Sequence, residues 1–121
     1  MKRFIIALLL FLLPSWTWAA APVTYYVNSS STGTGDGTTT AITGANAAFK
    51  TIAEVNAKSF AAGDSCLFNR GQTWREQLNP SSSGSAGLPI TFGAYGSGAK
   101  PKILGSIDLH HADPHKVTPP R

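Results

Sequence analysis

The sequence predicts a mainly β fold that carries one short helix. Runs rich in β-branched and aromatic residues recur along the chain at Thr24–Asn28, Ser65–Asn69 and Pro89–Tyr95. Corners of Gly, Pro and Ser separate these runs. Thr51 and Glu54 have the spacing of a capping box, which marks a helix start. On periodicity alone, short strands with such corners fit a sandwich as well as a solenoid.

Residues 1–19 have the layout of a secretory signal peptide. Lys2 and Arg3 precede an unbroken apolar run over residues 4–13, which is too short to cross a bilayer as a stable helix. Cleavage after Ala19 puts Thr17 and Ala19 at the small-residue positions, and an uncleaved anchor is the disfavoured alternative. We therefore expect a secreted protein, extracellular or periplasmic, with no stable membrane span after cleavage.

The remaining composition sets limits on partners. Removing 19 of 121 residues leaves 102, enough for one small domain, and the formal charge of +4 falls to about +2 without Lys2 and Arg3. The other basic residues are scattered, so nucleic-acid binding is not expected. A mild positive charge suits an acidic polysaccharide. Cys66 is the only cysteine, so no internal disulfide forms, and its apolar strand predicts a buried side chain.

The helix follows a first strand and a long loop. Residues 24–28 are β-formers, and the loop over residues 29–44 is almost entirely Ser, Thr and Gly around one Asp. Phe49, Ile52 and Val55 then recur every three residues as one apolar stripe, and Gly63 follows as a stop. This stripe needs an apolar surface, and the open end of a β-solenoid provides one.

The later strands alternate between two faces. In the strand over 65–69, Cys66 and Phe68 share one face and Leu67 takes the other, and Arg70–Gly71 makes the corner. A strand over 72–78 is expected next, and a Ser-rich loop then leads to a strand over 89–95. Two short apolar pieces over 102–104 and 107–109 finish the series.

Taken in order, these segments resemble the pectate-lyase-like right-handed parallel β-helix proteins, at their N-terminal cap and first turns. The segments that carry the resemblance are Phe49–Ala53, Gly63–Phe68, Arg70–Glu76, Gly87–Gly96, Lys100–Pro101 and Gly105. It runs from about Thr24 to Gly105. The resemblance implies that residues 20–109 form the start of such a solenoid, which includes one short capping helix. Residues 110–121 would then be a flexible tail that contains His and Pro. The stretch 38–48 is longer and less Pro-rich than the family pattern, which indicates a variable loop.

The resemblance also implies a function class. Its members are exported proteins that bind or cleave polysaccharides, and some are calcium-dependent lyases in which a Lys or Arg removes a sugar C5 proton. Those residues lie on later turns of the family, and no residue of this chain matches them, so no catalytic residue is assigned. Calcium remains a cofactor that the family allows, without a site in this chain. Non-catalytic adhesins share the fold, so fold does not decide activity.

Two clusters are candidate sites. The first cluster is Trp74, Arg75 and Glu76, which together supply an aromatic ring, a cation and a carboxylate. Such a set can stack on a sugar ring and bind its hydroxyls, although the alternation of apolar residues also explains Trp74 as a core residue. Four residues near the end have metal-ligand character for zinc, nickel or copper, although a solvated tail explains them as well: His110, His111, Asp113 and His115.

The number of turns predicts an incomplete fold. Solenoid turns bury their interior only against neighbours, and stable examples need about three or more repeats and two caps. One cap and two turns are visible, so we expect an open edge that favours self-association, in a chain that is the front end of a longer protein or only marginally folded.

We expect this chain to act as the N-terminal portion of an exported β-helix protein that binds or processes polysaccharide, without its own catalytic centre. If the full-length protein is an enzyme, it would be a polysaccharide lyase or glycoside hydrolase. The alternatives are a non-catalytic surface module and a truncated inactive product.

Overall fold

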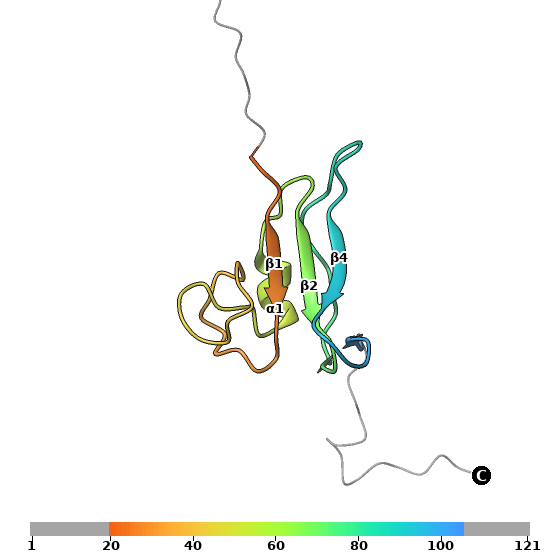
Figure 1. Cartoon of the computed structure of the whole chain (residues 1–121). Helices are drawn as coiled ribbons and strands as arrows, with labels where there is room; N and C mark the ends of the chain where they lie inside the picture. The colour runs from red at the N-terminus through yellow and green to blue at the C-terminus, as the bar shows by residue number, and fades with distance from the viewer. Residues whose placement is uncertain (1–19, 106–121) are drawn as a thin grey trace, which may run out of the picture.

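Two small parallel sheets and one short helix make up the computed structural model, which describes residues 20–105 (Figure 1). The first sheet has the order β1-β2-β4, and the second pairs β3 with β5. The strands are β1 (Thr24–Val27), β2 (Ser65–Asn69), β3 (Thr73–Trp74), β4 (Thr91–Tyr95) and β5 (Lys102–Ile103), and the helix is α1 (Ile52–Ala57). The predicted signal peptide, the apolar piece at 107–109 and the tail at 110–121 lie outside the described residues.

The sheets repeat with the spacing of one chain turn. Between β2 and β4 the paired positions are 26 residues apart, as where Ser65 meets Thr91, and between β3 and β5 they are 29 apart, as where Thr73 meets Lys102. Between β1 and β2, which the long loop and α1 separate, they are 41 apart, as where Thr24 meets Ser65. The chain passes through β2 and β3, returns, and passes through β4 and β5 beside them. The predicted mainly β fold with one short helix is confirmed, and its open sheets are compatible with an incomplete β-rich fold. A complete β-helix stays a prediction.

Helix α1 begins where the sequence predicts and ends earlier. Thr51 Oγ1 accepts a hydrogen bond from Glu54 N at 3.2 Å, and Glu54 Oε2 accepts one from Thr51 N at 2.7 Å, so the capping box is formed. Ile52 and Val55 are fully buried and face the core. The helix closes at Lys58, ahead of the expected stop, because the backbone there becomes extended.

The predicted strand over 72–78 is wrong beyond Trp74. Only Thr73 and Trp74 pair with β5. After them the chain turns toward α1, where Asn56 Nδ2 donates to Gln77 O at 2.9 Å and Asn56 Oδ1 accepts from Asn79 N at 2.7 Å. Contacts with the helix, which lies some 20 residues earlier, therefore replace the strand pairing that local alternation suggests.

The core is closed at the β1 end and open at the β4 end. Beside β1, Phe49 N donates to Tyr26 O at 2.9 Å and Tyr26 N donates to Gly37 O at 2.7 Å, so the long loop covers that edge. Inside, Val27 and Cys66 are fully buried, whereas Phe92 on β4 packs against the core only partly buried. Within residues 20–105 no strand pairs with the outer edge of β4. The inward side chains of β4 therefore keep part of their surface in water.

Candidate functional site

Trp74 belongs to the core of the described fold. Its side chain is 4% exposed, its indole Nε1 donates to Lys50 O at 2.9 Å, and its ring meets Phe68 edge to face at 5.3 Å. A ring held in this way satisfies its one polar atom and offers no open face for stacking. Arg75, which follows it, is exposed at the surface.

Glu76 binds the start of α1. Its carboxylate accepts hydrogen bonds from Ala53 N at 2.9 Å and from Ile52 N at 3.3 Å. These donors belong to the first helical turn, where backbone N–H groups lack partners and the helix dipole favours a negative charge. The structure thus separates the three predicted sugar-binding residues, because Trp74 points into the core and Glu76 toward the helix. Their carbohydrate-binding role stays a prediction.

The predicted metal ligands His110, His111, Asp113 and His115 lie outside the described residues. Over residues 20–105 no group of three or more His, Cys, Asp or Glu side chains is placed to hold a metal ion. In the same part of the chain, no helix is long and apolar enough to cross a membrane.

The carboxylates of the described part stabilise its backbone. Asp64 is 2% exposed and accepts from Val23 N and Ala61 N, both at 2.8 Å. Asp36 lies in the long loop and accepts from Thr38 Oγ1 at 2.6 Å and Thr38 N at 2.9 Å, and these bonds lower the pKa of its carboxyl group. With Glu54 and Glu76 in the helix cap, each of the four carboxylates in residues 20–105 has a structural contact.

The only cysteine is shielded, as its apolar strand predicts. Cys66 is fully buried, and burial raises the pKa of its thiol to about 12. The thiolate is the nucleophilic form, so this side chain is inert in the folded protein.

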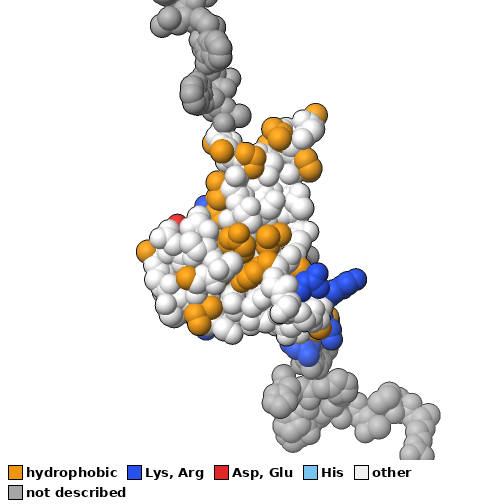
Figure 2. Space-filling model, viewed as in Figure 1, with side chains coloured by type: hydrophobic (Ala, Val, Ile, Leu, Met, Phe, Trp, Pro, Cys, Tyr) orange, Lys and Arg blue, Asp and Glu red, His pale blue; other side chains and the backbone are white. Residues whose placement is uncertain are grey.

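The outward face of the first sheet carries an aromatic pair that the sequence reading did not single out. The rings of Tyr26 on β1 and Tyr95 on β4 meet edge to face at 5.1 Å, and burial raises the pKa of the Tyr95 phenol. Between them, Leu67 of β2 pairs with Gly93 of β4, where a Cβ atom would lie 3.0 Å from Leu67 Cδ2. The glycine therefore leaves room for the Leu67 side chain. Figure 2 shows apolar side chains gathered on this face of the molecule.

Beside this aromatic pair lies a corner rich in cations. Arg70 N donates to Tyr95 O at 3.0 Å, Gly71 N donates to Ala99 O at 2.8 Å, and Lys102 N donates to Gln72 O at 2.9 Å. These bonds stack the Arg70 corner of one turn on the Lys100 and Lys102 stretch of the next. Lysine and arginine side chains gather at this end of the sheets in Figure 2.

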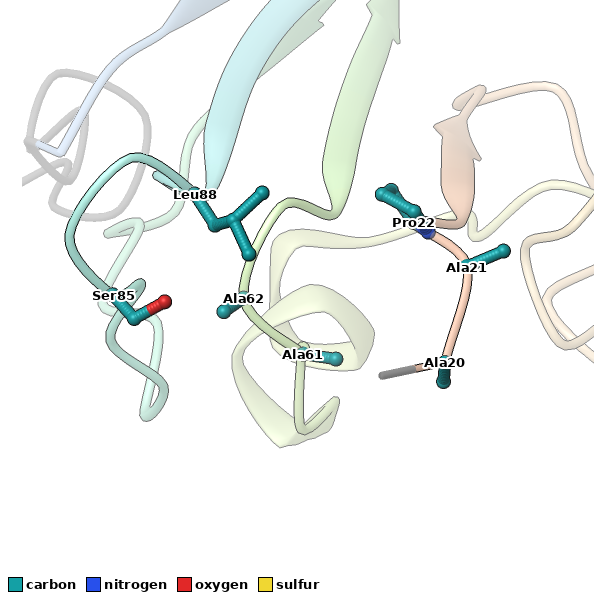
Figure 3. A pocket seen from close by; sticks show the side chains of 7 residues that line it. All are labelled: Ala20, Ala21, Pro22, Ala61, Ala62, Ser85 and Leu88. Carbon is teal, nitrogen blue, oxygen red and sulfur yellow. The ribbon is translucent and has the colours of Figure 1, made fainter. Parts of the chain in front are cut away.

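An apolar hollow of about 480 Å³ lies at the opposite end of the strands (Figure 3). Its lining residues are Ala20, Ala21, Pro22, Ala61, Ala62, Ser85 and Leu88. Ser85 supplies the only side-chain polar group among them, so the hollow has no set of groups for acid–base or metal chemistry.

Comparisons with known proteins give structural neighbours only. No family model matches the chain, and no curated protein matches it. The selenomethionine derivative of the GH136 lacto-N-biosidase from Eubacterium ramulus is similar with a TM-score of 0.55 and 33% identity, over 65% of this chain and 12% of that chain. The native form of the same enzyme gives 0.54 and 34%, over 64% and 12%.

This chain therefore spans about 12% of the length of the proteins it matches. The neighbour is a glycoside hydrolase, so the likeness supports a carbohydrate-related, β-rich protein fragment. The more specific resemblance to pectate-lyase-like proteins stays a prediction.

Proposed function

We propose that this chain forms the N-terminal cap and first two turns of a right-handed parallel β-helix, in an exported protein that binds or processes polysaccharide. The observation that carries the architecture is the parallel pairing of β2 with β4 and of β3 with β5, at separations of 26 and 29 residues. Parallel strands joined by a crossover are right-handed in nearly all proteins, and each turn here makes such a crossover.

The asymmetric burial supports further turns beyond β4 and β5. The loop and α1 cover the β1 side, where Val27, Ile52 and Val55 are fully buried. On the other side Ile90, Phe92 and Ile103 remain partly exposed against the core. A solenoid turn buries its interior only when a neighbour stacks on it, so another turn beside β4 would complete this core.

The polysaccharide part of the proposal rests on the lacto-N-biosidase likeness, which favours a glycoside hydrolase over a lyase for the whole protein. In residues 20–105 the carboxylates hold backbone groups, so we assign this part a capping role and place any catalytic groups on other turns. The same observation favours a second candidate, a non-catalytic surface-binding β-helix module. A truncated inactive product is the third reading.

The intact mass of the native exported product tests the proposal. Capture with an antibody against residues 65–78, after denaturation, isolates every form that carries this segment. We expect a protein that begins at Ala20 and is much longer than residues 20–121. A mass matching residues 20–121 would instead mean a short protein that lacks further turns, and a product that keeps residues 1–19 would refute export by signal cleavage.

Glycan binding by the same captured product tests the carbohydrate part separately. An array of plant, microbial and host glycans should show saturable binding that free oligosaccharide competes away. A product of the expected length that binds and cleaves none of them would overturn the polysaccharide function while leaving the architecture in place.

A further inference from the structure

The two tyrosines on the outward face of the first sheet are in ring contact although their strands are not neighbours. Tyr26 lies on β1 and Tyr95 on β4, with β2 between them. Their ring centroids are 5.1 Å apart, and the rings meet edge to face. Aromatic side chains on one face of a sheet reach beyond the directly opposite position. Two phenol rings that are far apart in the chain are therefore close enough to react with each other.

These two rings are also the most accessible of the easily oxidised side chains in residues 20–105. The phenols, the thiol and the indole of that range are Tyr25, Tyr26, Cys66, Trp74 and Tyr95. Tyr25, Cys66 and Trp74 belong to the core, with exposed fractions of 8%, 0% and 4%, whereas Tyr26 and Tyr95 are half-buried. A one-electron oxidant in solution therefore reaches the Tyr26–Tyr95 pair before the other three side chains.

Neither phenol is fixed by a hydrogen bond. The Tyr95 hydroxyl is buried and has no hydrogen-bond partner within residues 20–105. The Tyr26 hydroxyl makes no hydrogen bond in that range either, but it is not buried, so water reaches it. Each ring can turn about its side-chain bonds without breaking a polar contact. The Tyr26 hydroxyl can also release its proton directly to solvent.

We propose that Tyr26 and Tyr95 form an oxidative cross-linking site, at which hydrogen peroxide and a haem peroxidase join the two rings by a bond between their ortho carbons. Each phenol first gives up one electron and its hydroxyl proton. The two phenoxyl radicals then couple, and the hydrogen on each coupled carbon moves to the oxygen, which restores both phenols. The two electrons and two protons reduce one hydrogen peroxide molecule to two water molecules, so the protein loses two hydrogen atoms.

The bond ties the cap to the outermost described strand of the first sheet. It joins β1, whose edge the long loop covers, to β4, whose outer edge pairs with no strand of residues 20–105. A covalent link between such distant positions stabilises a fold chiefly by restricting the unfolded chain. Oxidants act on proteins outside the reducing cytosol, so the site rests on the proposed function only for export.

Treatment of the purified exported protein with a haem peroxidase and hydrogen peroxide tests the site, and mass spectrometry of a proteolytic digest locates the product. We expect a peptide that joins Tyr26 to Tyr95 within one chain, at a yield that does not depend on protein concentration. Tyr95→Phe keeps the ring and removes only a hydroxyl that makes no hydrogen bond. It should lower the yield of intrachain link at least about tenfold, because only phenols held together couple at a high effective concentration. Tyr25→Phe is the matched control and should cross-link as the parent does.

Three outcomes would overturn the proposal. The first is that no such peptide forms while N-acetyltyrosine added to the same solution is coupled, which shows that the oxidant is active. The second is a link found only in covalent dimers, at a yield that rises with protein concentration. The third is an equal yield of intrachain link in Tyr95→Phe with its circular dichroism spectrum preserved. These measurements require neither a long product nor a bound glycan, so their failure is distinct from failure of the mass or array tests.

Discussion

Replacing Glu76 tests whether this carboxylate holds the cap together, as its contacts with α1 indicate. Glu76→Ala removes both acceptors for Ala53 N and Ile52 N, at 2.9 and 3.3 Å. Loss of an N-terminal cap costs about 0.5–2 kcal/mol, and loss of a negative charge at a helix start adds about 0.3–1 kcal/mol. The second contact is long and the side chain is half-buried, so we expect a loss of about 1.5 kcal/mol in the free energy of unfolding.

Trp74 provides the assay, because it is the only tryptophan after residue 19. Its fluorescence should shift when urea unfolds the core around it, and about 1.5 kcal/mol corresponds to a fall of roughly 6–12 °C in Tm for a domain of this size. Glu76→Gln keeps one acceptor and should lose about half as much. Gln77→Ala, the exposed neighbour, is the matched control and should change stability by less than about 0.5 kcal/mol.

The reasoning would be refuted if Glu76→Ala were as stable as Gln77→Ala. Weaker glycan binding by Glu76→Ala with unchanged stability would instead support the sugar-binding role that the sequence predicts for this residue.

Three further predictions concern the core and the turns. Cys66 should react with a thiol reagent at pH 8 only after unfolding, since burial raises its pKa to about 12; stoichiometric labelling of the native protein would contradict this. The pair Thr73→Cys, Lys102→Cys should form a disulfide on oxidation, because these residues face each other in register, whereas a pair shifted by two positions should not; mass spectrometry decides, and equal yields would disprove the register. Gly37→Ala should destabilise the fold by more than Gly71→Ala in urea titrations, by about 1–3 kcal/mol. Both have a φ near +80°, but only at Gly37 would the new Cβ meet a ring, at 2.5 Å, so equal losses would refute the packing there.

Local patterns predicted what depends on near neighbours along the chain. The capping box of Thr51 and Glu54 formed as expected, because both partners lie within one helical turn. The inward placement of Cys66 and Phe68 also held, since alternation along an extended strand fixes which side chains share a face.

The candidate site shows where such local reasoning ends. Alternation placed Trp74 and Glu76 on one side of a longer strand, yet Glu76 binds α1, and its backbone partners are 23 and 24 residues earlier in the chain. The contact of Glu76 with α1 competes with continued strand pairing, and which of the two forms depends on where the helix packs against the sheet. Local periodicity carries no information about that position.

The sequence by itself determined a mainly β chain with one capped helix and an apolar, alternating set of core residues. Only the tertiary structure decided that β1, β2 and β4 lie side by side in parallel, and that Arg70 meets the Lys100 stretch across a turn. It also brought together the rings of Tyr26 and Tyr95, which are 69 positions apart in the chain. The physical reason is that the pairing of distant strands is set by the sum of many long-range backbone and packing contacts, whereas a helix cap or an alternating strand is set by the few residues within it.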